Sequence, residues 1–267
     1  MSRSTAGGLF QLGQLTNAMN AALEAVKNDP TSEAKRWFLI EMSLFAGDTE
    51  RADKHLDWLC SSAASPNLAA LQTRQWVRAE TTRREVWEKG RVPGFVSDPP
   101  EHIKHTLAAL VAKRSGDTEA TIAALHAAEE SRPNMMGTKA GSVFKGWRDL
   151  DDFAAGFLEI FSPNGEYNWV PLELVASLEF TPPTRALDLI YRTVGLTLHD
   201  GRDGTVVIPT LYPLSDRAPS EELRLGRGTD YSTSAPIQGV GLREFFIGNE
   251  VHTVLQLTSV QFDGAAP

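Results

Sequence analysis

Carboxylates form the densest group of potentially reactive side chains in the C-terminal half of the chain. Asp149, Asp151 and Asp152 lie close together, and Glu159 follows them. Carboxylate oxygens are the ligands that Mg²⁺ and Ca²⁺ prefer, so this cluster could form a metal-dependent catalytic site. It has neither EF-hand spacing nor a recognisable second set of ligands. We therefore favour a capping or turn cluster that leads into a strand, and keep a metal-dependent enzyme as the alternative.

Three other combinations of residues could carry chemistry, and each has a simpler explanation. His102 and His105 lack the glutamate of a His-Glu-x-x-His zinc site, so we expect them on a solvated helix face. Arg227 and Asp230 could clamp a charged ligand, although an internal salt bridge that holds a turn is the simpler arrangement. Cys60 has no His or Asn context that would make it a nucleophile, and we interpret it as a packing residue.

The chain also lacks the motifs of common enzyme classes. It contains no Gly-x-Ser-x-Gly nucleophile elbow and no Walker phosphate-binding loop. Its single cysteine excludes an intramolecular disulfide and a cysteine-based zinc site. We therefore predict a protein that is not an enzyme, with no catalytic residues, no cofactor and no bound metal.

Composition and charge narrow the class of protein further. Of the 267 residues, 42% are hydrophobic and 22% are charged, which is typical of a globular protein. No run approaches the ~20 apolar residues of a membrane helix, and the first residues lack a secretory signal, so we expect a cytoplasmic protein that does not bind membranes. The net charge of −8 falls entirely within residues 141–267. Such an acidic surface repels phosphate backbones and argues against nucleic acid as a partner.

The N-terminal half contains an internal repeat. Gly-Asp-Thr-Glu at residues 47–50 recurs at residues 116–119, and an Asp-Pro pair recurs with the same offset of 69 residues. This offset is close to twice ~34 residues, which is the repeat length of tetratricopeptide hairpins. In each hairpin, Gly would end the first helix in a left-handed conformation and Asp would cap the second helix. Apolar residues recur at four-residue spacing before each turn: Ala34, Phe38 and Met42 align with Ile103, Leu107 and Val111. We expect six large side chains to be buried where the hairpins pack: Phe38, Met42, Leu56, Leu107, Val111 and Leu125.

Between the two copies, residues 68–89 lack the Gly-Asp turn and could form one long helix that Gly90 and Pro93 stop. The C-terminal half is richer in Gly and Pro and alternates short apolar runs with turns. This pattern predicts strands over residues 157–161, 167–170, 178–180, 196–198, 205–208 and 254–262, and short helices within residues 171–177 and 183–191.

These patterns together predict an α+β protein with two domains. Residues 1–137 would form a tetratricopeptide-like helical scaffold. Residues 138–267 would form an acidic α+β domain on a mostly antiparallel sheet.

Stacked helical hairpins create a groove that accepts an amphipathic helix or an extended peptide. If the Phe38 stripe faces the partner helix of its hairpin, Trp37 and Glu41 lie on another face of the same helix. Arg74 and Arg78 lie one turn apart on the following helix of the array. We predict that these four residues line the groove and bind a partner. The alternatives are that Trp37 is ordinary core and the arginines are solvated, and that the scaffold only supports the C-terminal domain.

Several short sequence blocks together carry a resemblance through their order and spacing along the chain. They include residues 44–56, residues 144–152 (Phe-Lys-Gly-Trp-Arg-Asp-Leu-Asp-Asp), residues 167–171 (Tyr-Asn-Trp-Val-Pro), residues 208–213, residues 225–231 and residues 239–243. Over most of residues 38–260 this series resembles the ImpE/TagJ family, also called SciE-type. The chain departs from it at Tyr231 and Leu242, where many members have Trp and Gln.

The resemblance implies a function that composition and spacing do not give. Members of this family are cytoplasmic, non-enzymatic accessory components of bacterial type VI secretion, a contractile injection machine. The resemblance implies that this chain binds the N-terminal helix of the small sheath subunit. It also implies a link to the ClpV-type AAA+ unfoldase that recycles contracted sheath.

Overall fold

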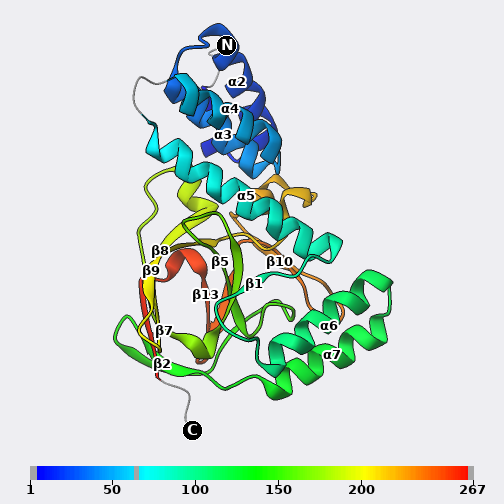
Figure 1. Cartoon of the computed structure of the whole chain (residues 1–267). Coiled ribbons are helices and arrows are strands. Elements are labelled where there is room, and N and C mark those ends of the chain that lie inside the picture. The colour runs from blue at the N-terminus through cyan, green and yellow to red at the C-terminus, as the bar shows by residue number, and fades with distance from the viewer. Residues whose placement is uncertain (1–4, 63–65, 264–267) are drawn as a thin grey trace.

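The computed structural model describes residues 5–62 and 66–263, and it joins a helical N-terminal part to a β-rich C-terminal part (Figure 1). This arrangement confirms the predicted α+β class. The helices are α1 (Ala6–Gln11), α2 (Leu15–Asn28), α3 (Glu33–Phe45), α4 (Thr49–Ser62), α5 (Leu68–Lys89), α6 (Glu101–Ser115), α7 (Thr118–Ser131) and α8 (Glu221–Arg224). In the part of the chain that is described, no helix is long and apolar enough to cross a membrane.

The two Gly-Asp turns connect α3 to α4 and α6 to α7, as the repeat predicts. Gly47 and Gly116 have φ angles of 73° and 77°, which an amino acid with a Cβ adopts only under strain. The Asp48 carboxylate accepts a hydrogen bond of 2.9 Å from the Arg51 amide, and Asp117 accepts one of 2.9 Å from the Ala120 amide. The same short sequence thus builds the same turn and the same helix cap at two places.

Helix α5 takes the place of a hairpin between the two copies. It runs unbroken for 22 residues and ends at Gly90, which has a φ of 82°. Figure 1 shows α5 lying between α2–α4 and the sheet. Trp76 and Trp87 on α5 contact Tyr191 and Trp169 of the sheet, with ring centroids 6.2 Å and 6.0 Å apart. Because α5 covers the sheet, the helices do not continue as a regular superhelix.

The apolar stripes of the two hairpins are buried to different degrees. Met42, Leu56 and Leu125 are buried as predicted, whereas Phe38 and Leu107 are half-buried. The prediction for Val111 is wrong, because 60% of this residue is exposed. Residues four positions apart are offset by about 40° around a helix. The last residue of a three-residue stripe therefore points away from the partner helix of its hairpin. The α6–α7 hairpin also projects from the edge of the molecule, away from α2–α4 (Figure 1).

The β-rich part is built on a nine-stranded sheet, counted over the described residues, in the order β1-β6-β5-β9-β8-β7-β14-β2-β3. All its neighbours are antiparallel except β1 and β6, which confirms the prediction of a mostly antiparallel sheet. The strands of this sheet are β1 (Gly94–Phe95), β2 (Met136–Lys139), β3 (Ser142–Lys145), β5 (Phe157–Phe161), β6 (Tyr167–Pro171), β7 (Val175–Phe180), β8 (Tyr191–Leu198), β9 (Asp203–Pro209) and β14 (Ser259–Phe262).

Two smaller sheets complete the β-rich part. One has the order β13-β12-β4 and the other pairs β10 with β11. Their strands are β4 (Trp147–Asp149), β10 (Thr229–Tyr231), β11 (Gly239–Gly241), β12 (Glu244–Ile247) and β13 (Glu250–Thr253).

The large sheet separates two hydrophobic cores. Alternate residues of β5 and β6, such as Phe157 and Trp169, pack with the helices, while Leu158 and Val170 pack into a second core with β12 and β14. The first core therefore continues from the helices into the sheet. The N-terminal helices α1 to α7 end at Ser131 before β2 begins, and the division of the chain at residue 137 remains a prediction.

Three segments differ from the sequence prediction. The short helices expected in residues 171–177 and 183–191 are the 3₁₀ turns η1 (Leu172–Leu174) and η2 (Ala186–Leu189), and β7 begins within the first of these segments. Residues 254–262 are not one strand, because the turn η4 (Val254–Gln256) precedes β14. Arg192 donates hydrogen bonds to the carbonyl oxygens of Val254 and Leu257, the latter at 2.8 Å. These contacts with Arg192 of β8 hold residues 254–257 in the turn that precedes β14.

Candidate functional site

The carboxylates of the acidic cluster are held by arginines, a tyrosine and backbone amides. Asp149, at the end of β4, accepts hydrogen bonds of 2.9 Å from both Arg243 and Tyr212. Asp151 accepts hydrogen bonds from two backbone amides, those of residues 153 and 239, at 2.8 Å and 2.9 Å. Asp152 pairs with Arg148 at 2.8 Å. These contacts place the cluster in a turn that leads toward β5, which is the arrangement that the sequence favoured.

Glu159 lies at the centre of a buried ionic network between α5 and the sheet. Arg83 of α5 binds it with Nε at 2.8 Å and Nη2 at 2.9 Å, which is a bidentate pair. Arg243 forms a further ion pair with Glu159, and the Trp87 indole donates to it at 2.9 Å. The network fixes α5 to the sheet, because Arg83 and Trp87 of α5 both bind the carboxylate of Glu159 on β5.

Burial and ion pairing move the pKa values of these groups in opposite directions. Burial alone would raise the pKa of Glu159, but the nearby Arg83 and Arg243 lower it to about 2. Burial raises the pKa of Asp149 to about 6 against the opposing effect of Arg243. Burial and the neighbouring Asp149 raise the pKa of Asp151 to about 7.

The described residues contain no group of three or more His, Cys, Asp or Glu side chains that could hold a metal ion. Each carboxylate of the cluster has a protein partner instead. The geometry thus gives no support to the alternative of a metal-dependent enzyme built on these residues.

The four predicted partner-binding residues lie in two separate environments. Trp37 and Glu41 both contact Arg185, whose guanidinium lies 4.7 Å from the Trp37 ring centroid and whose Nε lies 3.0 Å from Glu41 Oε1. Sequence reasoning missed Arg185, because 144 residues separate it from Glu41 and no local pattern connects them. Burial raises the pKa of Glu41 against the effect of Arg185.

The arginines of α5 are not beside Trp37 and Glu41. Arg74 binds Asp53 and Asp57 of α4 at 2.8 Å and 2.7 Å, so it holds two helices together. Arg78 is exposed, and its Nη1 lies 3.3 Å from the Gln75 side chain on the same helix. Helix α4 packs against α5, which explains why Arg74 turns inward while Arg78 remains available to a partner.

An open groove lies next to Glu41. Its volume is about 420 Å³, and it runs between α1, α3 and the segment that contains η2. Apolar side chains form most of its lining, with Glu41 and Arg185 as the charged pair: Phe10, Phe38, Pro183, Ala186 and Leu189. The groove therefore combines apolar anchoring positions with charges, as a site for an amphipathic helix requires.

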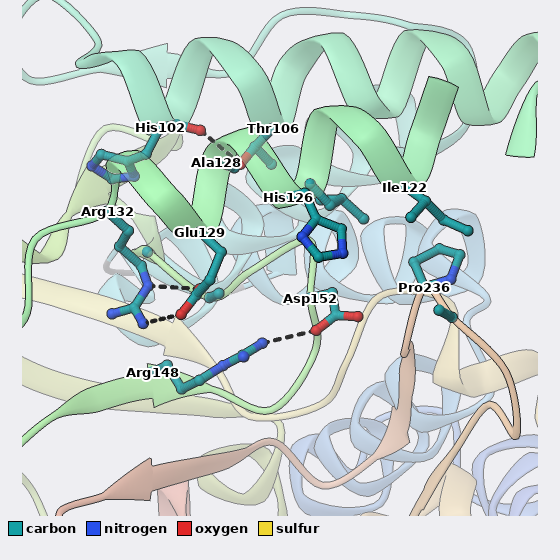
Figure 2. A pocket seen from close by; sticks show the side chains of 14 residues that line it. His102, Thr106, Ile122, His126, Ala128, Glu129, Arg132, Arg148, Asp152 and Pro236 are labelled. Carbon is teal, nitrogen blue, oxygen red and sulfur yellow. Dashed lines mark hydrogen bonds and ion pairs between the residues drawn. The ribbon is translucent and has the colours of Figure 1, made fainter. Parts of the chain in front are cut away.

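A second cavity of about 200 Å³ lies between the α6–α7 hairpin and the segment from β4 to β5. Figure 2 shows the Glu129–Arg132 pair, at the C-terminal end of α7, facing the Arg148–Asp152 pair across this pocket. The remaining wall is mainly apolar and includes Ile122, Leu125, Ala128, Ala155 and Pro236. We call this cavity the hairpin pocket.

His102 lines the hairpin pocket, and the expectation of a solvated histidine is wrong. Only 3% of this residue is exposed, and its Nε2 lies 2.7 Å from Glu173 Oε1. Glu173 belongs to η1, so this contact depends on how α6 packs on the sheet.

The expected bridge between Arg227 and Asp230 is also replaced by another contact. Arg227 donates to the carbonyl oxygens of Phe10 and Gln11 at the end of α1, the latter at 2.9 Å. A cation is favoured at this position, because the C-terminus of a helix carries partial negative charge.

The fold defines an α+β protein. Its groove beside Glu41 and its hairpin pocket both lie where helices meet the β-rich part. Residues 141–261 match the family described as ImpE protein. The chain is 27% identical over 257 residues to the type VI secretion system accessory component TagJ of Pseudomonas aeruginosa, a match that covers 96% of this chain and 90% of the relative.

A solved structure extends the comparison to the fold. The chain resembles the crystal structure of protein VPA1032 from Vibrio parahaemolyticus with a TM-score of 0.89 and 26% identity, over 97% of both chains. Together these findings confirm the resemblance to the ImpE/TagJ family that the sequence blocks indicated: residues 141–261 match the ImpE model, and nearly the whole chain is similar to TagJ.

Proposed function

We propose that this chain is an accessory component of a type VI secretion system and acts as a cytoplasmic, non-enzymatic adaptor. The similarity to TagJ over nearly the whole chain supports this role. The partners proposed here are the N-terminal helix of the small sheath subunit and the ClpV-type unfoldase. An adaptor of this kind needs a surface for a helix and does not need a reactive group.

The groove beside Glu41 is the observation that carries the proposal. Phe10, Phe38 and Leu189 offer apolar contacts to one face of a helix, and the charges of Glu41 and Arg185 lie within the same groove. Helices dock in such grooves through apolar residues spaced three and four apart. Trp37 and the exposed Arg78 would contact the flanks of the bound segment, whereas Arg74 would act by holding α4 and α5 in place.

A binding experiment tests the groove. The intact chain is titrated with a synthetic peptide of the small sheath subunit's N-terminal helix, and the dissociation constant is measured by calorimetry. Ala186→Gln places a larger side chain in the groove and is expected to weaken binding at least tenfold, or about 1.4 kcal/mol. Ala108→Gln, at an exposed position of α6, is the matched control and should not change the affinity.

The double variant Trp37→Ala with Arg78→Ala tests the flanking residues in the same titration. It is also expected to weaken binding at least tenfold while circular dichroism shows a folded chain. Unchanged affinity in both the groove variant and the double variant would move the helix site elsewhere. The link to the unfoldase predicts that the sheath subunit co-elutes with the ClpV-type protein only when this chain is present.

A further inference from the structure

The hairpin pocket shares no lining residue with the proposed helix groove and has no role in the function proposed above. Its arginines have little hydrogen-bonding capacity left. Arg132 uses Nε and Nη2 on Glu129, at 3.0 Å and 2.5 Å, and Nη1 on the Trp147 carbonyl at 3.1 Å. Arg148 uses Nη2 on Asp152 and Nε on the Asp149 carbonyl. Only Nη1 of Arg148 lacks a partner in the described part of the chain.

The acceptors of the pocket are less occupied than the donors. A carboxylate can accept about four hydrogen bonds. Both Glu129 and Asp152 are partly exposed, with 44% and 29% of their side chains accessible. Glu129 binds Arg132 through both of its oxygens. Asp152 binds Arg148 through Oδ1 and the amide of Ile237 through Oδ2, the latter at 2.7 Å. Each carboxylate thus uses about half of its capacity and can receive further hydrogen bonds from a ligand.

His102 closes the buried end of the pocket. In the neutral ring, the proton shared with Glu173 is on Nε2, so Nδ1 presents a lone pair. Nδ1 has no hydrogen-bond partner among the described residues. The ring packs closely against the backbone of Gly156, because a Cβ at this position would lie only 2.7 Å from Nδ1.

The electrostatic environment favours a cation. The four charged groups of the pocket cancel one another, so the rest of the surrounding domain decides the sign of the potential. Residues 141–267 carry the whole net charge of −8. The summed field of such a domain attracts positive groups to a cleft.

We propose that the hairpin pocket binds a Lys or Arg side chain from a partner protein. The methylene groups of that side chain would pack along Ile122, Leu125 and Pro236, and its charged end would be bound by Glu129 and Asp152. The cavity of about 200 Å³ is large enough for one such side chain.

An exposed apolar row next to the pocket offers a place for the residues that flank the basic side chain. Phe246 on β12 is paired with Arg148 on one side and with Val251 on the other. Phe246 and Val251 are 39% and 51% exposed. Because directly paired residues of neighbouring strands point to the same face of the sheet, the three side chains form a continuous strip that reaches the pocket at Arg148.

Small amides that carry one side chain test the proposal on the intact protein. N-acetyl-arginine amide is titrated to 50 mM, and the ring signals of His102 and His126 are followed by NMR. Saturable shifts of both rings are expected, with no shift of His55, which lies outside the pocket. N-acetyl-norleucine amide has the stem without the charge, and N-acetyl-glutamate amide has the opposite charge. Both are expected to bind at least fivefold more weakly.

A matched pair of variants locates the binding. Glu129→Gln removes a pocket carboxylate and is expected to weaken arginine amide binding at least threefold. Glu130→Gln makes the same change in net charge at an exposed position that does not line the pocket, and should leave the affinity unchanged. The proposal is wrong if arginine amide produces no saturable shift, if norleucine or glutamate amide binds equally well, or if the two variants behave alike.

Discussion

The two helical hairpins of this protein share the same turn sequence but differ in their surroundings. The α3–α4 hairpin packs between α2 and α5, and Met42 in its first helix is fully buried. The α6–α7 hairpin projects from the β-rich part, and Val111, which aligns with Met42 in the repeat, is 60% exposed (Figure 1). A repeated sequence can thus specify a local structure twice while its neighbours decide how much of each copy is core.

The hairpins also differ in what they leave open. The first contributes Phe38 and Glu41 to a groove that also borders α1 and residues from the β-rich part. The second forms one wall of the hairpin pocket, whose opposite wall comes from the β-rich part. Both cavities therefore depend on the β-rich part, and neither is the regular groove between stacked repeats.

The largest expected difference between the hairpins is in core stability. Met42→Ala removes a fully buried side chain and should lower the free energy of unfolding by about 2–5 kcal/mol. Val111→Ala, at the aligned and exposed position, should change it by less than about 0.5 kcal/mol. Urea unfolding of both variants provides the comparison. Equal losses would show that the two hairpins are enclosed alike.

A second prediction concerns pH and the turn on which the second hairpin rests. Lys113 of α6 lies over the ring of Phe153, next to Asp151, with 4.8 Å between Nζ and the ring centroid. The pKa of Asp151 is raised from 3.8 to about 7, so the folded chain retains a proton that the unfolded chain has lost between these pH values. The contribution of Asp151 to stability is therefore complete below about pH 4 and falls as the pH rises to 7.

Asp151→Asn removes this titration and provides the test. The stability advantage of the natural chain over the variant should be largest near pH 4 and should shrink by at most about 4 kcal/mol by pH 7. Urea unfolding of both proteins across this pH range gives the two curves. A difference that does not change with pH would contradict the raised pKa of Asp151.

The two turn glycines should respond differently to the same substitution. Both have positive φ, so Gly47→Ala and Gly116→Ala each place a Cβ in a left-handed backbone at about 1–2 kcal/mol. At Gly116 the new Cβ meets nothing within 4 Å, whereas at Gly47 it would lie 2.2 Å from the Asp216 carboxylate. Asp216 also binds Arg84 at 2.8 Å. Thermal unfolding should show a larger loss for the Gly47 variant, and equal losses would rule out this clash.

The smallest difference is expected at the helix caps. Asp48→Ala and Asp117→Ala each remove one hydrogen bond of 2.9 Å to a backbone amide. Each substitution should lower the free energy of unfolding by about 1 kcal/mol. Because the cap is a local contact, the two values should agree within about 0.5 kcal/mol in urea unfolding. A clear disagreement would mean that the surroundings of the hairpins also govern their caps.

The candidate site could be predicted only in part. The sequence placed Trp37 and Glu41 on one face of α3, and both contact Arg185, which lines the open groove together with Glu41. It could not identify Arg185, which approaches them from the β-rich part. It also missed the hairpin pocket, because His102 acquires its partner Glu173 only when η1 packs against α6.

Local sequence by itself determined the turns, the caps and most helices and strands. Gly at a left-handed position, Asp at a helix start and alternation in strands act through contacts within a few residues, so their effects can be read along the chain. The tertiary structure alone decided that Val111 is exposed, that Glu159 is bound by Arg83 and Arg243, and where the two cavities open. Burial and charge pairing depend on segments far apart in the chain, and no local pattern specifies which of them will meet.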